Sequence, residues 1–155
     1  MTAHPTQRRS AAEQERLEAA LVEIFEHRIR FNETLGLKVL SAKPPEPTLR
    51  FEMRDALVGH YASGRLHGGV ISATLDAMGG FAIMVAIAEK HADETLEQVG
   101  HRFSRVGTID LRVDYLRQGL GKHFIASAEV TRLGGRVAAT QMKLANDEGT
   151  LIATA

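Results

Sequence analysis

The stretch from Leu66 to Asp76, LHGGVISATLD, brings a histidine, two glycines and one acid to the start of an apolar run. A helix that begins here presents unpaired N–H groups and a partial positive charge at its first turn. Gly68 and Gly69 would let a ligand oxygen come close, because neither residue has a side chain in the way. Such a turn suits a donor site for an oxyanion, and a tight entry into a helix is the alternative interpretation.

Asp76 is the one charged residue in the apolar run from Val70 to Ala88. A lone carboxylate on an apolar helix is costly unless it is paired or used in chemistry. It is therefore either bonded to a neighbouring backbone group or arginine, or it acts as a base. A carboxylate base beside a polarised carbonyl group makes a hydrolytic site, and the two features together predict one.

The spacing of these residues adds a geometric constraint. Gly68 and Asp76 are eight residues apart in the sequence, which in a helix is about 12 Å of rise at roughly 1.5 Å per residue. One carbonyl group cannot easily meet both residues of one chain. Two antiparallel copies of the helix would bring Gly68 of one chain to Asp76 of the other, so the spacing indicates a two-fold dimer with two shared sites.

Periodicity and turn signals predict the elements that position this site. Ser10 and Glu13 have the form of a capping box, which starts an amphipathic N-terminal helix expected over 10–34 and stopped by Gly36. LKVLSA and TLRFEM are typical of two strands, joined by the turn KPPEP. After the irregular segment RDALVGHYASGR, we expect the long apolar helix from about Gly69 to Glu89, and the polar loop KHADETLEQVG ends it.

Beyond that loop the hydrophobic period changes to two. In TIDLRVDYL one face of the predicted half-buried strand carries the apolar residues Ile109, Leu111, Val113 and Tyr115. KHFIASAEVTRL and VAATQMKLAND predict a hairpin about Gly134–Gly135, and GTLIATA a last short strand. The order of elements predicts an α+β domain with one antiparallel sheet and a helix packed on it.

Composition narrows the class of protein. A chain of 155 residues suits one domain, expected over 10–155 after a flexible N-terminus over 1–9. The absence of cysteine excludes disulfides and thiolate chemistry, and it fits a reducing compartment such as the cytoplasm. The 19 basic and 19 acidic residues balance, which gives no electrostatic case for nucleic acid.

Membrane insertion and metal chemistry are not expected. The polar N-terminus lacks the apolar core of a secretory signal. The run from Val70 to Ala88 is long enough to span a membrane, but Asp76 near its middle would cost about 2.5–3.5 kcal/mol, so a buried core helix is favoured. The seven histidines lack metal-ligand spacing, and His60 and His67 are too far apart to form a pair, so we expect no metal or other cofactor.

LHGGVISATLD, with TIDLRVDYLRQG some thirty residues on, resembles the hotdog-fold acyl-CoA thioesterases. The nearest branch is that of the phenylacetyl-CoA and 4-hydroxybenzoyl-CoA thioesterases, in which an acid follows a His-Gly-Gly motif. The likeness runs from about Gly36 to the end of the chain. It implies a hotdog fold, an antiparallel sheet wrapped around a long central helix, here with an extra N-terminal helix. It also implies a homodimer with a continuous sheet, with a dimer of dimers as the alternative.

The resemblance implies roles for the motif residues. Gly68 would offer its N–H to the thioester carbonyl, with Gly69 beside it in the substrate-binding turn. Asp76, from the other subunit, would act as base or nucleophile. His67 would shape the loop or assist catalysis. Where many members carry Asn or Gln before the histidine, this chain has His60 and Tyr61, so His60 either takes over that polar role or is a surface residue.

The resemblance also implies where the substrate lies. Some members have a threonine four residues after the acid, where this chain has Gly80. The glycines at 79–80 make room for an acyl chain, or they allow close helix packing, and the tunnel or the core would contain Phe81, Ile83, Met84 and Val85. CoA phosphates would meet Arg117, Arg132 and Arg136, which are otherwise surface charges.

These observations predict an acyl-CoA thioesterase that releases free acid and CoA. The absence of tryptophan and the few aromatic residues near the helix favour aliphatic over aromatic acyl groups. We expect these acyl groups to be of medium to long chain length. One alternative is a non-catalytic acyl-CoA-binding module on the same fold, against which the acid at position 76 argues. The other is a hotdog dehydratase, whose usual histidine context LHGG does not resemble.

Overall fold

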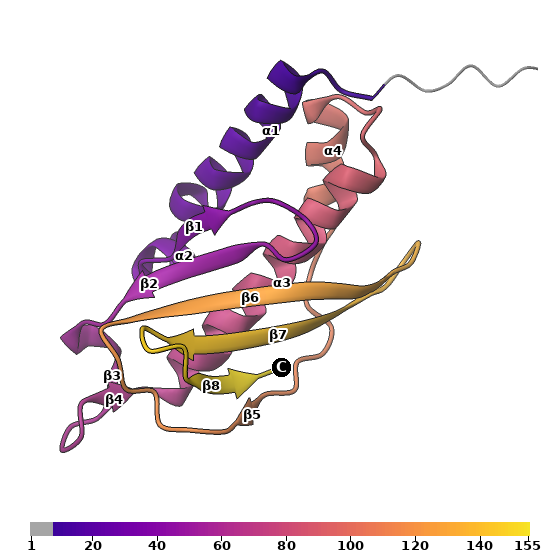
Figure 1. The fold of residues 1–155 in the computed structure, drawn as a ribbon. Helices are drawn as coiled ribbons and strands as arrows, with labels where there is room; N and C mark the ends of the chain where they lie inside the picture. Colours follow the sequence, from indigo (N-terminus) through magenta and orange to yellow (C-terminus); the bar gives the residue numbers. More distant parts are fainter. Residues whose placement is uncertain (1–7) are drawn as a thin grey trace, which may run out of the picture.

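A six-stranded antiparallel sheet lies against one long helix, α3 (Gly68–Lys90), in the computed structural model, which describes residues 8–155 (Figure 1). The strand order is β1-β2-β6-β7-β8-β5. The strands are β1 (Lys38–Ser41), β2 (Thr48–Glu52), β5 (Asp114–Tyr115), β6 (His123–Leu133), β7 (Ala138–Asn146) and β8 (Leu151–Thr154). The predicted α+β class is confirmed, and so are the β6–β7 hairpin and the long helix, which begins one residue earlier than expected.

The N-terminal segment is helical but interrupted. It comprises α1 (Ala11–Glu23), a π-helical turn (Ile24–Arg28) and α2 (Arg30–Leu35), which Gly36 ends in a left-handed conformation with φ of 74°. The Ser10 capping box is present as predicted. The helix breaks at Ile29, where the backbone turns extended, and Asn32 donates a side-chain N–H to the Phe25 carbonyl at 3.1 Å. The segment therefore bends and stays close to α3.

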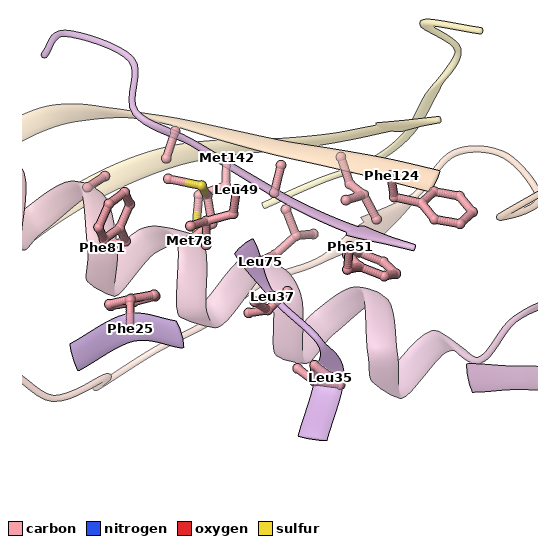
Figure 2. Packing of buried hydrophobic residues seen from close by; sticks show 14 of the residues in the cluster. Phe25, Leu35, Leu37, Leu49, Phe51, Leu75, Met78, Phe81, Phe124 and Met142 are labelled. Atoms are coloured by element: carbon pink, nitrogen blue, oxygen red, sulfur yellow. The ribbon is translucent and has the colours of Figure 1, made fainter. Parts of the chain in front are cut away.

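The core forms between α3, the sheet and the N-terminal helices. Figure 2 shows Met142 and Phe124 of the sheet on one side of α3 and Phe25 on the other. The rings of Phe25 and Phe81 pack with their centroids 4.7 Å apart. Among residues 8–155, α3 is the one helix long and apolar enough to cross a membrane. Buried side chains along its length, Met78 and Phe81 among them, pack in this core, as in the core helix of a folded domain.

Arg9 closes the C-terminal end of α3. Its guanidinium donates to the carbonyls of Ala88, His91 and Glu94 at 2.5, 2.7 and 3.0 Å, and its backbone N–H donates to the Ala92 carbonyl at 2.7 Å. The last carbonyls of a helix lack partners within the helix and carry partial negative charge, so a cation satisfies both needs. Of the segment expected to be flexible, residues 1–7 lie outside the described residues, and Arg9 is held by these bonds.

The loop expected after α3 contains a further helix, α4 (Leu96–Phe103), and the prediction of a polar loop over 90–100 is wrong there. Thr95 and Gln98 form a capping box, with bonds of 2.8 and 3.3 Å between each side chain and the other residue's backbone N–H. Val99 and Phe103, four residues apart, are buried against the body of the protein. A short amphipathic helix therefore replaces the loop.

The strand predicted over 108–116 is also wrong for most of its length. Within residues 8–155, only its β5 part, Asp114–Tyr115, pairs with another strand, opposite Thr154 and Ala153 of β8. Residues before Asp114 lie past the end of this neighbouring strand and have no ladder to join. Ile109 is 80% exposed as a result. Leu111 and Val113 keep the predicted orientation and pack partly buried against the core.

The segment expected to be irregular before α3 contains a 3₁₀ turn (Asp55–Leu57) and a small hairpin of β3 (Val58–His60) and β4 (Arg65–Leu66). Gly59 allows this hairpin to approach the helix start, because a Cβ at Gly59 would lie 2.3 Å from the Cα of His67. The His67 N–H donates to the Leu57 carbonyl at 2.9 Å. These contacts fix the entry into α3.

Candidate active site

The first turn of α3 has a fixed arrangement of donors and acceptors. His67 is the N-cap residue, and its Nδ1 accepts a hydrogen bond from the Gly69 N–H at 2.8 Å. The Tyr115 hydroxyl donates to the Gly68 carbonyl at 3.1 Å. The peptide group between Gly68 and Gly69 is therefore held on both sides. The Gly68 N–H has no acceptor among residues 8–155, so it remains available at the positive end of the helix.

The two motif glycines differ in what surrounds them. A Cβ at Gly69 would lie 2.9 Å from His67 Nδ1, so the imidazole cap needs a glycine at that position. A Cβ at Gly68 would meet the Tyr115 ring at 3.5 Å, an ordinary contact. Because the Gly69 N–H is already bonded to His67, only Gly68 can offer a backbone donor to a ligand from this turn.

Asp76 lies on α3, two turns after Gly68, with its side chain half-buried. The Thr108 hydroxyl donates to Asp76 Oδ1 at 2.6 Å. The other carboxylate oxygen, Oδ2, accepts no hydrogen bond from the part of the chain that the structure describes. Thr108 therefore holds one oxygen and leaves the other for chemistry.

Thr108 and Tyr115 are the site residues that the sequence analysis did not assign. Both belong to TIDLRVDYL, the second half of the family resemblance, which passes alongside both the acid and the helix start. The available signal was the side-chain hydroxyl at each end of this segment. The apolar alternation instead directed attention to burial.

A cavity of about 330 Å³ contains Asp76. The π-helical turn, α2, α3, β7 and the segment before β5 all contribute to its wall. The lining residues from α3 are Ala73, Asp76, Ala77, Gly79, Gly80, Ile83 and Met84. Of the residues expected in an acyl tunnel or the core, Ile83 and Met84 line the cavity, whereas Phe81 and Val85 are buried in the core.

A larger groove of about 1350 Å³ adjoins this cavity. It lies between the C-terminal end of α3, α4 and the tip of the β6–β7 hairpin. Both spaces share the lining residues Ile83, Val106, Gly107, Ile109 and Ala138. The groove also has basic residues on its wall, Lys90, Arg102, Arg105 and Arg136 among them. Arg102 is paired with Glu94 at 2.5 Å.

His60 lies apart from the acid. It is exposed at the end of β3, its Nδ1 lies 3.1 Å from Ser63 Oγ, and its ring stacks on Tyr61 with centroids 5.8 Å apart. It does not line the cavity that contains Asp76. Within one chain, His60 is therefore a residue of the small hairpin next to the helix start.

The three arginines expected to meet CoA phosphates lie at two ends of the sheet. Arg117 donates to the Leu151 carbonyl at 3.1 Å, at the beginning of β8. Arg132 and Arg136 flank the β6–β7 turn, which projects at the other end of the sheet (Figure 1). Arg136 lines the larger groove. A single chain therefore offers a pair of arginines at the hairpin and a separate one near β8.

The geometry of α3 keeps the donor and the acid apart. The helix is continuous from Gly68 to Lys90, so the eight residues between Gly68 and Asp76 correspond to about 12 Å of rise. Each chain carries the Gly68 N–H at the start of α3 and the Asp76 carboxylate about two turns further along it. The two groups cannot act on one carbonyl group of a substrate within a single chain.

The chain belongs to the Thioesterase superfamily, whose family model matches residues 63–153. A protein of Escherichia coli strain K12, the medium/long-chain acyl-CoA thioesterase YigI, is 37% identical over 133 residues, which are 86% of each chain. A solved structure from Shewanella oneidensis, described as related to the thioesterase superfamily, has 34% identity and a TM-score of 0.87 and covers 94% of this chain and 95% of that one. Mouse thioesterase superfamily member 2 shares the fold at 21% identity with a TM-score of 0.66, covering 94% of each chain. The expected hotdog fold is confirmed.

Proposed function

We propose that the protein is a thioesterase that hydrolyses medium- to long-chain acyl-CoA to free acid and CoA. The observation that carries this proposal is that one helix of this Thioesterase superfamily chain holds both groups that the reaction needs. These are the Gly68 N–H, which has no acceptor among residues 8–155, and the Asp76 carboxylate, which lies in a cavity. The acyl-CoA substrate class is supported by the E. coli relative, which is named for medium- and long-chain acyl-CoA.

The proposed reaction follows from what each group can do. The Gly68 N–H donates to the thioester carbonyl oxygen and stabilises the oxyanion that forms when the carbonyl carbon is attacked. Asp76 Oδ2 takes a proton from water as the water oxygen attacks that carbon. When the tetrahedral intermediate collapses, the carbon–sulfur bond breaks, and the proton passes from Asp76 to the leaving CoA thiolate. Thr108 is a positioning residue that fixes Oδ1.

A second route uses the same groups. The Asp76 carboxylate attacks the carbonyl carbon directly and displaces CoA thiolate, which leaves a mixed anhydride between Asp76 and the acyl group. Water then hydrolyses the anhydride and returns the free carboxylate and the fatty acid. Both routes need the Gly68 N–H at the carbonyl oxygen, so the mutational test below does not depend on the choice between them.

Two copies of the chain would unite the separated groups. The segment 108–113 is unpaired at the edge of the sheet, and its neighbour Tyr115 is 55% exposed. Ile109, 80% exposed, lies in the same segment. An open edge with alternating apolar residues is a template for pairing with another strand. We propose a homodimer that pairs through this edge and sets Gly68 of each chain against Asp76 of the other.

Subunit mixing tests the shared site. Asp76→Asn removes the base, and Gly68→Val blocks the approach to the N–H while its Cβ meets only an ordinary contact with Tyr115. Random mixing makes half of the dimers mixed, and each mixed dimer regains one of two sites, so activity should return to about a quarter of the wild-type value per site. The control is each variant alone, folded and dimeric but inactive. If subunits demonstrably exchange and no activity returns, the sites are not shared.

The arginine pair at the hairpin is proposed to bind CoA phosphates, because the guanidinium fork matches phosphate oxygens. Arg132 and Arg136 flank the β6–β7 turn, and both side chains are exposed. Replacement of either by alanine should raise KM for acyl-CoA but not for the matching acyl-pantetheine thioester. Equal effects on both substrates would exclude a phosphate role.

A further inference from the structure

Gly79 and Gly80 are neighbours in α3 but face different surroundings. A Cβ at Gly79 would lie 2.7 Å from Met142 Sδ and 3.2 Å from Thr140 Oγ1, so that glycine allows β7 to pack closely on the helix. A Cβ at Gly80 would meet no atom within 4 Å. Glycine inside a helix is unfavourable relative to alanine or leucine. Packing explains Gly79 but does not explain Gly80.

Gly80 borders the cavity that contains Asp76. The two residues are four positions apart on a continuous helix, so they lie on the same face, one turn apart. The same face continues with Ile83 and Met84 in the cavity and then with Ile87 in the adjoining groove. A half-buried apolar strip therefore leads from the carboxylate towards the C-terminal end of α3.

The length of this strip indicates what it could hold. Asp76 and Ile87 are eleven residues apart, which is roughly 16 Å along a helix. An extended chain advances about 3.5 Å for every three bonds, or roughly 1.2 Å per bond. A strip of that length accommodates about thirteen bonds of an extended hydrocarbon chain, or about fourteen carbons. No charged residue lies on the α3 face between Asp76 and Ile87.

We propose that Gly80 determines which acyl chains the site accepts. Its missing side chain keeps the passage next to Asp76 open, so that the tail of a long acyl group runs along Ile83, Met84 and Ile87. A larger residue at position 80 would close the passage one turn beyond the carboxylate and would restrict the site to short acyl groups. This inference rests on the proposed acyl-CoA hydrolysis and names the residue that sets its chain-length range.

The test compares Gly80→Leu with Gly100→Leu. Gly100 lies in helix α4, a Cβ there also meets nothing within 4 Å, and the residue lines neither the cavity nor the groove. Both variants replace a helical glycine by a good helix former, so neither should lower the melting temperature. The measurement is kcat/KM for saturated acyl-CoA thioesters from butyryl-CoA to palmitoyl-CoA.

For Gly80→Leu, the ratio of kcat/KM for palmitoyl-CoA to that for butyryl-CoA should fall at least tenfold, and Gly80→Ala should give a smaller fall in the same direction. Gly100→Leu should keep the wild-type ratio. An unchanged ratio in Gly80→Leu overturns the inference alone. An equal loss at every chain length also overturns it, because the side chain would then obstruct the thioester or the CoA arm. A wild-type protein that cleaves none of these substrates overturns the proposed function and the inference with it.

Discussion

Helix α3 contains two glycine pairs, Gly68–Gly69 at its start and Gly79–Gly80 in its middle, and each pair divides in the same way. One member is required by a close neighbour: Gly69 by His67 Nδ1 at 2.9 Å and Gly79 by Met142 Sδ at 2.7 Å. The other member is not required by packing. A Cβ at Gly68 would make only ordinary contact with Tyr115, and a Cβ at Gly80 would meet no atom within 4 Å.

In each pair, therefore, one glycine has a structural role and the other has a proposed functional role. Gly69 and Gly79 hold the helix against its cap and its sheet, and their loss should appear in stability. Gly68 and Gly80 leave space where a substrate is proposed to lie, one for the carbonyl oxygen and one for the acyl chain. Asp76 lies between the two pairs, and in the proposed dimer one substrate would meet Asp76 and Gly80 of one chain and Gly68 of the other.

The largest effect is expected at Asp76, between the pairs. Asp76→Asn keeps the size of the side chain and an oxygen that can accept the Thr108 hydroxyl, but it removes the base. The rate should fall by about 10²–10⁴-fold, the range for loss of a general base. Steady-state kinetics with a long-chain acyl-CoA checks this, with the melting temperature as the control. A variant with near-normal turnover would remove Asp76 from the mechanism.

A smaller effect, on stability, is expected at the packed glycine of the middle pair. Gly79→Val places methyl groups against Met142 and Thr140, and overpacking of this kind costs about 1–3 kcal/mol. At about 2–4 °C per kcal/mol for a chain of this size, the melting temperature should fall measurably. A double-mutant cycle with Met142→Ala provides the control, because the smaller partner should relieve part of the loss. Simple additivity would contradict the assigned contact.

The first pair should show the same contrast at lower magnitude. Gly69→Ala presses a methyl group on His67 Nδ1 and breaks the N-cap bond, whose loss costs about 1 kcal/mol. Gly68→Ala adds only an ordinary contact and should leave the free energy of unfolding within about 0.5 kcal/mol of wild type. Urea unfolding of both variants measures the difference. Equal destabilisation by the two substitutions would contradict the claim that packing requires Gly69 but not Gly68.

An effect of opposite sign and of similar size to that at Gly69 is expected on the buried face of α3, away from both pairs. Thr74 is fully buried, and its hydroxyl has no hydrogen-bond partner among the described residues. Thr74→Val removes this hydroxyl with little change of shape, so the free energy of unfolding should rise by about 1 kcal/mol. Thr74 does not line the cavity, and activity should stay at the wild-type level. A loss of stability would indicate that the hydroxyl has a partner after all.

Much of the fold could be predicted because its signals are local. The capping box at Ser10, the stop at Gly36 and the hairpin turn at Gly134–Gly135 each depend on a few adjacent residues. Helix α4 carries an equally local capping box, but its eight residues offer only Val99 and Phe103 as buried periodic positions in a polar stretch. The strand prediction before β5 failed for another reason, since the alternation is correct but no strand within residues 8–155 reaches this segment.

The candidate site also contains residues that local signals predicted and residues whose roles depend on distant contacts. Residue types and spacing were enough to single out Gly68 and Asp76, because a helix start and an acid on an apolar face can be recognised from neighbouring residues. Gly79 is required because Met142 packs closely on it, and the Asp76 carboxylate is held by Thr108, 32 positions away in the sequence. No short pattern encodes such contacts, which is why the sequence left the roles of the 79–80 pair open.

Arg9 has a consequence for how the protein can be shortened. Its bonds to Ala88 and Glu94 join residues 79 and 85 positions apart, so almost the whole first half of the chain lies inside the loop that they close. Removal of residues 8–10 would take away no buried apolar side chain, but it would leave the carbonyls of Ala88, His91, Ala92 and Glu94 without the donors that Arg9 supplies. Arg9 therefore belongs to the folded domain. A domain boundary drawn from hydrophobicity alone would exclude it.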